Sequence, residues 1–151
     1  MMRETMAVEA IETGTVIDHI PAGQGLNILA RIQSHNAQAR VTVGLNLPSK
    51  GSGQKDIIKV EGWLFSEQDA AEMALYAPKA TVNIIQGYRV VNKFQIGLPN
   101  AFVNIFACPN SNCISHSEPV SSRFYVKADS DSVQLRCHFC ERSFSDSLFK
   151  H

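Results

Sequence analysis

All four cysteines of this 151-residue chain fall between residues 108 and 140, and the first hundred residues contain none. They form two short pairs, Cys108-x4-Cys113 and Cys137-x2-Cys140. Two such knuckles, brought together by strands, can place four thiolates at the corners of a tetrahedron, which is the geometry of structural zinc. The spacing therefore predicts a zinc site with ligands Cys108, Cys113, Cys137 and Cys140. Four protein ligands leave no open position for catalysis, so we expect a structural metal.

A redox Cys-x2-Cys motif or four free thiols are the alternatives to a metal site. A redox function leaves Cys108 and Cys113 unexplained, and the sequence lacks the strand-then-helix context in which such motifs act. His116 also stands at ligand spacing from Cys113. Because four thiolates already complete a tetrahedron, we expect His116 to lie in the following loop and His138 to be exposed.

The charge of the chain is balanced overall and along its length. Fourteen Lys and Arg residues accompany fourteen Asp and Glu residues, nine of each within 1–100 and five of each within 101–151. Neither part has the basic excess that binding to nucleic-acid phosphates requires. The N-terminal residues lack the apolar stretch of a signal peptide, and no segment is apolar enough to span a membrane. We therefore expect a cytoplasmic protein that binds neither nucleic acid nor membrane.

Hydrophobic periodicity predicts an α+β domain in the first hundred residues. Apolar residues three and four positions apart predict a helix over 24–34 and a second helix from Ser66 to Pro78. Strand-like runs fill the remainder, with a hairpin turn at Gln86-Gly87; they span 16–20, 40–47, 57–65, 81–85 and 88–91. Connections this short force neighbouring strands to be antiparallel. The order β-α-β-β-α-β-β predicts a ferredoxin-like domain with both helices on one face of the sheet.

A short segment, Leu98-Pro99-Asn100, is the most linker-like part of the sequence. We therefore predict two domains. The α+β domain would cover residues 1–99, and a small all-β four-cysteine domain would cover residues 100–151. The second is too short to bury much surface of its own, so zinc binding would supply its folding energy.

The first hundred residues carry no recognisable catalytic motif, such as a nucleophile elbow or a P-loop. Asp18 and His19 are adjacent, so their side chains should point to opposite faces of a strand and could not act on one atom. Lys59 and Lys93 each lie near the end of a predicted strand. Two converging lysines could hold a phosphate group, whereas the alternative is that both are ordinary solvated lysines.

Several long segments carry a family resemblance. They are Gly14-Thr-Val-Ile-Asp-His-Ile-Pro21, Gly44-Leu-Asn-Leu-Pro-Ser49, Leu75-Tyr-Ala-Pro78 with Ala80-Thr-Val-Asn83, and Cys108-Pro-Asn-Ser-Asn-Cys-Ile-Ser-His116 with Glu118-Pro-Val120. In these segments, and over nearly its full length, the chain resembles the regulatory chain of aspartate carbamoyltransferase. The resemblance implies a non-catalytic subunit with an N-terminal nucleotide-binding allosteric domain and a C-terminal four-cysteine zinc domain.

The resemblance also implies effectors and partners. In the family, CTP inhibits and ATP activates at the same site, and UTP often acts with CTP. Regulatory chains pair as homodimers through the allosteric domain, three dimers bridge two catalytic trimers, and each zinc domain docks on a catalytic chain. The complex joins carbamoyl phosphate and aspartate at the first committed step of pyrimidine biosynthesis.

Carried over residue by residue, the resemblance implies a nucleotide site in the first domain. Ala10 and Ile11 would lie beside the base, with Val16 packed near it. Asp18 would hydrogen-bond the ribose. The phosphates or sugar would be held by His19, Lys59 and Lys93, and the base and ribose pocket would be completed by Asn83, Ile85, Tyr88 and Val90.

The resemblance further places Asn110, Asn112 and Glu141 toward the catalytic chain, with local hydrogen bonding inside the knuckles as the alternative. It also places the residues before Val8 near the nucleotide site and a neighbouring chain.

Two rival functions belong to other classes of protein. A zinc-ribbon nucleic-acid-binding protein would need a basic face with exposed aromatic residues. An enzyme using Asp18 and His19 on a small metabolite would turn over substrate as an isolated chain.

Overall fold

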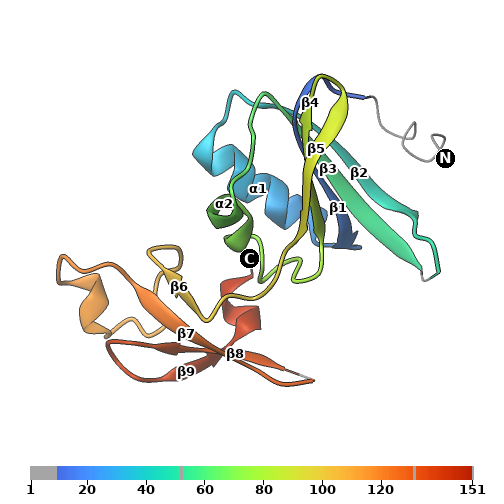
Figure 1. Cartoon of the computed structure of the whole chain (residues 1–151). Coiled ribbons are helices and arrows are strands. Elements are labelled where there is room, and N and C mark those ends of the chain that lie inside the picture. Colours follow the sequence, from blue (N-terminus) through green and yellow to red (C-terminus); the bar gives the residue numbers. More distant parts are fainter. Residues whose placement is uncertain (1–9, 52, 131, 151) are drawn as a thin grey trace. The chain divides into compact units, whose positions relative to one another are not determined.

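The computed structural model describes residues 10–51, 53–130 and 132–150. The chain forms two compact units, residues 1–97 and residues 98–151, each with its own sheet (Figure 1). Within the described residues, no helix combines the length and the apolar character that crossing a membrane requires.

An antiparallel sheet of five strands forms the first unit, in the order β2-β3-β1-β4-β5. The strands are β1 (Thr13–Pro21), β2 (Arg40–Pro48), β3 (Gln54–Glu61), β4 (Thr81–Gln86) and β5 (Arg89–Gln95). Together with helices α1 (Gly25–His35) and α2 (Glu67–Ala71), they follow the predicted order of elements. The α+β fold class is therefore confirmed.

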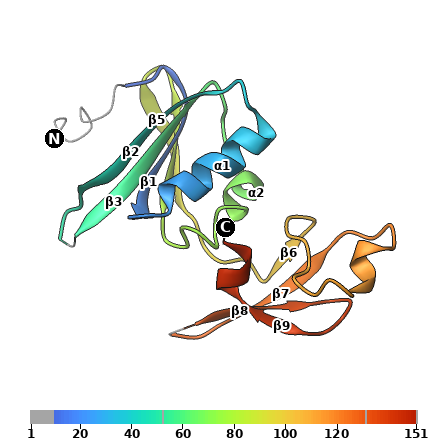
Figure 2. The same cartoon turned by 180° about the vertical axis from the view of Figure 1, so that it is seen from behind.

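Both helices lie on the same face of this sheet, as the two opposite views show (Figures 1 and 2). The core contains side chains that are fully buried, namely Ile17, Ile28, Ile32, Ile58, Val60 and Val82. We call the opposite face of the sheet, which carries the alternate residues of each strand, the outer face.

A β-bulge in β1 explains why two buried residues stand three positions apart. Ile17 and Ile20 are both 0% exposed, which regular strand alternation cannot produce. The pairing of β1 with β3 shifts register between these two residues, and His19 adopts a φ of 60°. The extra residue returns Ile20 to the core face.

The second helix is shorter than predicted. The apolar positions Ala70, Met73, Ala74 and Ala77 are all buried, as the periodicity indicated. However, α2 ends at Ala71, and the chain continues in tight turns whose hydrogen bonds mostly span three residues, such as Met73 N–H to Ala70 O at 2.9 Å. Such turns keep a similar spacing of buried residues without extending the helix.

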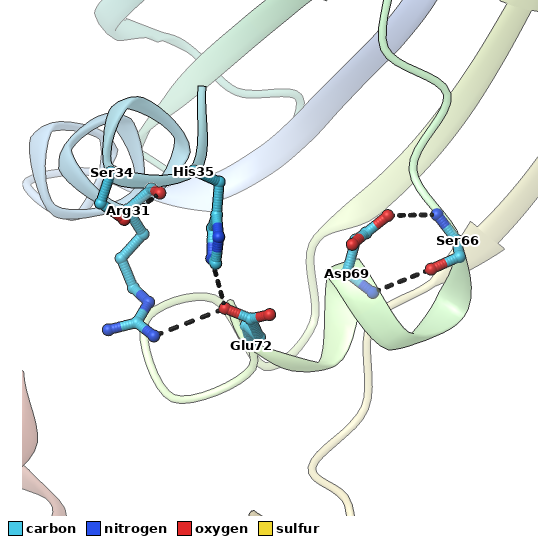
Figure 3. Close-up of polar contacts among 6 residues, drawn as sticks. All are labelled: Arg31, Ser34, His35, Ser66, Asp69 and Glu72. Atoms are coloured by element: carbon cyan, nitrogen blue, oxygen red, sulfur yellow. Dashed lines mark hydrogen bonds and ion pairs between the residues drawn. The ribbon is translucent and has the colours of Figure 1, made fainter. Parts of the chain in front are cut away.

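Polar contacts fix the start of α2 and its position beside α1 (Figure 3). Ser66 and Asp69 form a reciprocal capping box, with N–H to side-chain distances of 2.9 and 3.1 Å. Just past the helix, Glu72 Oε1 accepts from His35 Nε2 at 2.9 Å and from Arg31 Nη2 at 3.4 Å. One carboxylate therefore ties α2 to the last turns of α1.

A buried carboxylate, Asp56 on β3, organises the loop before α1. Its Oδ2 accepts from the backbone N–H groups of Gly23 (3.0 Å) and Gly25 (2.9 Å), and its Oδ1 accepts from that of Asn46 (2.9 Å). Asp56 is 0% exposed, while Gln24, the N-cap residue of α1, makes no side-chain capping bond. Asp56, which lies on strand β3, thus caps the distant helix α1 and places negative charge at the helix N-terminus. A Cβ at Gly25 would lie 2.8 Å from Asp56 Oδ2, so glycine permits this approach.

Two predicted boundaries were wrong. The hairpin turn is Gly87-Tyr88 rather than Gln86-Gly87, and both turn residues have positive φ, 63° and 65°, as a type I′ hairpin turn requires. Strand β3 ends at Glu61 rather than at residue 65.

The second unit is a four-stranded antiparallel sheet, in the order β6-β7-β8-β9. Its elements are β6 (Ala101–Val103), the 3-10 turn η2 (Ile114–His116), β7 (Arg123–Ala128), β8 (Val133–Cys137), β9 (Ser143–Ser145) and the 3-10 turn η3 (Asp146–Phe149). The prediction of a small β unit with four cysteines is confirmed.

Phenylalanines form the core of this second unit. Phe149 makes edge contacts with Phe106, Phe124 and Phe144, with ring centroids 5.1 to 6.3 Å apart. Phe102 makes a further edge contact with Phe106, with ring centroids 5.2 Å apart. A few aromatic rings thus supply most of the apolar packing around a short sheet.

Candidate metal centre and nucleotide face

The four cysteine sulfurs converge on one point in the second unit. Cys108 and Cys113 lie in the loop between β6 and η2, and Cys137 and Cys140 flank the turn after β8. All four Sγ atoms lie within 4.8 Å of one another. The Cys108–Cys140 and Cys113–Cys137 sulfur pairs are 3.8 and 3.7 Å apart.

This arrangement fits a tetrahedral metal ion. With metal–sulfur bonds of about 2.3 Å, the edges of a tetrahedral thiolate site measure about 3.8 Å. Three of the cysteines are buried, and Cys140 is half-buried. Soft thiolate ligands in this geometry suit zinc. Four thiolates close the coordination shell, so such an ion would hold structure rather than bind substrate.

Hydrogen bonds to sulfur compensate for burial at two of the thiols. Burial raises the pKa of Cys113, but hydrogen bonds from the Ser115 hydroxyl (3.1 Å) and N–H (3.5 Å) outweigh it and lower the pKa to about 6. At Cys140, burial is likewise outweighed, chiefly by a backbone hydrogen bond from Arg142, and the pKa is lowered. At Cys108, burial dominates and raises the pKa. A central cation would remove this remaining cost of ionisation.

Neither nearby histidine takes a ligand position. His116 Nε2 lies 3.0 Å from the carbonyl oxygens of both Cys108 and Asn110, so its ring holds the first knuckle closed. His138 is exposed, and its Nδ1 pairs with the Tyr125 hydroxyl at 2.7 Å. The expected exposure of His138 is therefore confirmed, and His116 lies in the 3-10 turn η2 that follows the first knuckle.

The three polar residues predicted to face a partner differ in their local contacts. Asn110 is half-buried, and its Oδ1 accepts from the N–H of Asn112 at 3.1 Å, which shapes the knuckle. The Asn112 side chain is exposed. Glu141 is also exposed, with Oε1 3.7 Å from Arg136 Nη2. Asn110 thus has a structural role, because its side chain shapes the first knuckle.

In the first unit, four of the predicted nucleotide residues form one row across the outer face. Val16 pairs with Lys59 on β3 and with Asn83 on β4, and Asn83 pairs with Lys93 on β5. Directly paired residues share a face of the sheet, so both lysines belong to the same surface as Asn83. Lys59 is 5% exposed, whereas Lys93 is exposed.

A bulge in β5 brings Val90 onto the same face as Lys93. Residues three apart on a regular strand point to opposite faces. Here Ile84 pairs with Asn92, but the next residue, Ile85, pairs with Val90. Strand β5 therefore has one extra residue at this point. Ile85 is two residues from Asn83, and Val90 therefore joins the outer face.

The remaining apolar residues gather at the hairpin end of this face. The Tyr88 N–H donates to Glu12 O at 3.1 Å, which places the segment before β1 beside the β4–β5 turn. Ile11 is buried against Gly14, where a Cβ would lie 2.9 Å from Ile11 Cδ1. Ala10 is exposed, and Tyr88 is 67% exposed.

Asp18 and His19 lie at the other end of the outer face, and the expectation that they point to opposite faces was wrong. The cause is the bulge in β1, which places the His19 ring 3.4 Å from the hydroxyl of Thr81, the residue paired with Asp18. Asp18 makes an ion pair with Lys55 (2.9 Å) that the sequence did not suggest. The carboxylate and the imidazole have different partners, so they do not form a catalytic dyad.

The segment before Val8, which the resemblance placed near the nucleotide site, lies outside the described residues.

An α+β unit with a cationic row on its sheet, joined to a four-cysteine metal-binding unit, defines a binding or regulatory subunit. Two family models match it: "Aspartate carbamoyltransferase regulatory chain, allosteric domain" over residues 6–97, and "Aspartate carbamoyltransferase regulatory chain, metal binding domain" over residues 101–149. The chain belongs to the family of aspartate carbamoyltransferase regulatory chains and is a non-catalytic subunit.

Curated relatives agree over nearly the full length. The regulatory chain of Tolumonas auensis is 53% identical over 146 residues, which cover 97% of this chain and 95% of the relative. That of Chromobacterium violaceum is 54% identical over 147 residues, covering 97% of both chains. That of Vibrio cholerae is 51% identical over 146 residues, covering 96% of this chain and 94% of the relative.

Proposed function

We propose that the first unit binds CTP and ATP at one site on its outer face, with UTP acting alongside CTP. The observation that carries the proposal is the row in which Lys59 and Lys93 share one sheet face with Asn83. Two cations on either side of the half-buried Asn83 in this row suit an anionic phosphate chain. The apolar hairpin end, with Ile11, Ile85 and Val90, suits the base.

The second unit would hold one zinc ion per chain and dock on a catalytic chain of aspartate carbamoyltransferase. The exposed side chains of Asn112 and Glu141, next to metal ligands, are available for that contact. Zinc would thus fix a rigid docking surface, because its ligands anchor both knuckles.

The chain would act in the cytoplasm as a homodimer within a complex of three regulatory dimers and two catalytic trimers. CTP inhibition and ATP activation would follow from linkage: a nucleotide shifts the catalytic equilibrium only if it binds one global state better than another. Such coupling is typically about 1–3 kcal/mol, and it is reciprocal. Substrate analogues should therefore weaken CTP binding.

We expect Lys93→Ala to weaken CTP binding by about tenfold, since it removes a charge-assisted hydrogen bond to phosphate. Calorimetric titration of the zinc-loaded chain with CTP measures this change. Arg89→Ala is the matched control, because Arg89 is an exposed cation on the same strand whose position is on the other face. Equal loss of affinity in both variants, or no CTP binding by the unmodified chain, would contradict the proposed site.

A further inference from the structure

A cavity of about 460 Å³ lies where the outer face meets the end of β1. Its lining includes His19, Lys55, Lys79, Thr81 and Gln95. This volume is in the range of small-molecule sites. Among the described residues that line it there is no carboxylate, and hydrogen-bond donors predominate. The cavity therefore favours an anion with several acceptor oxygens.

Lys79 is the cation in this cavity that has no acidic partner among the described residues, whereas Lys55 is engaged by Asp18 at 2.9 Å. The backbone that carries Lys79 is held in place, because Gln95 Nε2 donates to the Lys79 carbonyl at 3.2 Å. Its neighbour Ala80 accepts from the N–H of Ile96 at 2.8 Å. Lys79 therefore lines the cavity from a backbone that hydrogen bonds hold in place.

The cavity continues the row of site residues along the strands. Thr81 pairs with Gln95 two residues beyond the pair of Asn83 and Lys93, so both pairs belong to the outer face. Two residues of strand span about 7 Å. A phosphate held at the Lys93 row would therefore lie one short phosphate chain away from the cavity.

We propose that Lys79 is a further phosphate-binding residue, which recognises the terminal phosphates of a nucleoside triphosphate bound on the outer face. The inference rests on the proposed nucleotide site and adds to it a means of selecting triphosphates. A monophosphate held near Lys59 and Lys93 ends before the cavity. A triphosphate extends into it and gains the charge of Lys79.

Titration of the zinc-loaded chain with CTP, CDP and CMP tests this inference. We expect Lys79→Gln to weaken CTP binding by about five- to tenfold and to leave CMP binding unchanged. Lys79→Arg should restore most of the CTP affinity, since it keeps the charge. Lys127→Gln, the same change at an exposed lysine of the second unit, should alter neither.

Each other outcome has a distinct meaning. If the unmodified chain binds CTP and Lys79→Gln weakens CTP and CMP equally or not at all, the role of Lys79 is refuted and the nucleotide site stands. If the unmodified chain binds no nucleotide, the proposed function fails and the inference with it. If inorganic tripolyphosphate binds as tightly as CTP and also depends on Lys79, the cavity is a separate polyphosphate site, which overturns the inference.

Discussion

Removal of the metal is expected to unfold residues 98–151 and to leave the first unit folded. A structural zinc ion contributes about 10–16 kcal/mol of binding energy, which becomes folding energy where no site exists in the unfolded chain. In the described part of the second unit, the core consists mainly of phenylalanines around Phe149 together with Leu135, and burial makes two of the four thiols, Cys108 and Cys137, costly to ionise without a cation. The first unit has a separate core and contains none of the cysteines.

Two signals separate the units in one experiment with a strong chelator. Trp63 is the single tryptophan and lies in the first unit, against Phe65 at a centroid distance of 4.7 Å, so its fluorescence follows that unit alone. Far-ultraviolet circular dichroism follows both units. We expect the dichroism to fall while Trp63 emission stays constant. Unchanged dichroism after complete metal loss would refute the prediction.

A pair of neighbouring substitutions controls for nonspecific effects of mutation at the site. Cys137→Ser removes a ligand and should reproduce the effect of the chelator. His138→Gln changes an adjacent exposed residue that is not a ligand, and it should retain one metal ion per chain.

Asp56→Ala is expected to destabilise the first unit by about 3–5 kcal/mol, because three backbone N–H groups, one buried and two part-buried, lose the buried carboxylate that they share as acceptor. Those groups belong to Gly23, Gly25 and Asn46. The substitution therefore loosens the start of α1 together with the part of β2 near Asn46, where the pairing of β2 with β3 shifts register. Urea unfolding followed by Trp63 fluorescence measures the loss.

Asp69→Ala is the matched control for Asp56. It removes a carboxylate that caps α2 at an exposed site, and it should cost only about 1 kcal/mol. Asp56→Asn keeps one acceptor oxygen, so its loss of unfolding free energy should lie between the losses of the two alanine variants. If Asp56→Ala and Asp69→Ala were equally destabilising, the buried carboxylate would not have the role assigned to it.

Features encoded locally could be predicted from the sequence. The cysteine cluster follows from two short pairs, since each knuckle brings its own two sulfurs close together. The helix near residues 24–34 follows from apolar spacing, and the buried positions Met73 and Ala77 follow from the same rule even though the helix around them is shorter. The capping box at Ser66 is likewise a signal within four residues.

Features that depend on distant partners could not be predicted. The bulge at His19 and the one in β5 move side chains to the other face, and only the pairing of strands shows them. Asp56 caps a helix that begins 31 residues earlier, so no local start signal exists. For the same reason, the ion pair of Lys55 with Asp18 and the position of Lys79 in the lining of the cavity become visible only in the folded chain.

The most direct test of the account measures aspartate saturation of a catalytic trimer of aspartate carbamoyltransferase, alone and after mixing with this chain and zinc, with and without CTP. The account predicts hyperbolic saturation for the trimer alone, and sigmoidal saturation for the mixture with a midpoint that CTP raises. A complex that forms but remains hyperbolic and insensitive to CTP would contradict the claim that this chain transmits nucleotide binding to a catalytic partner.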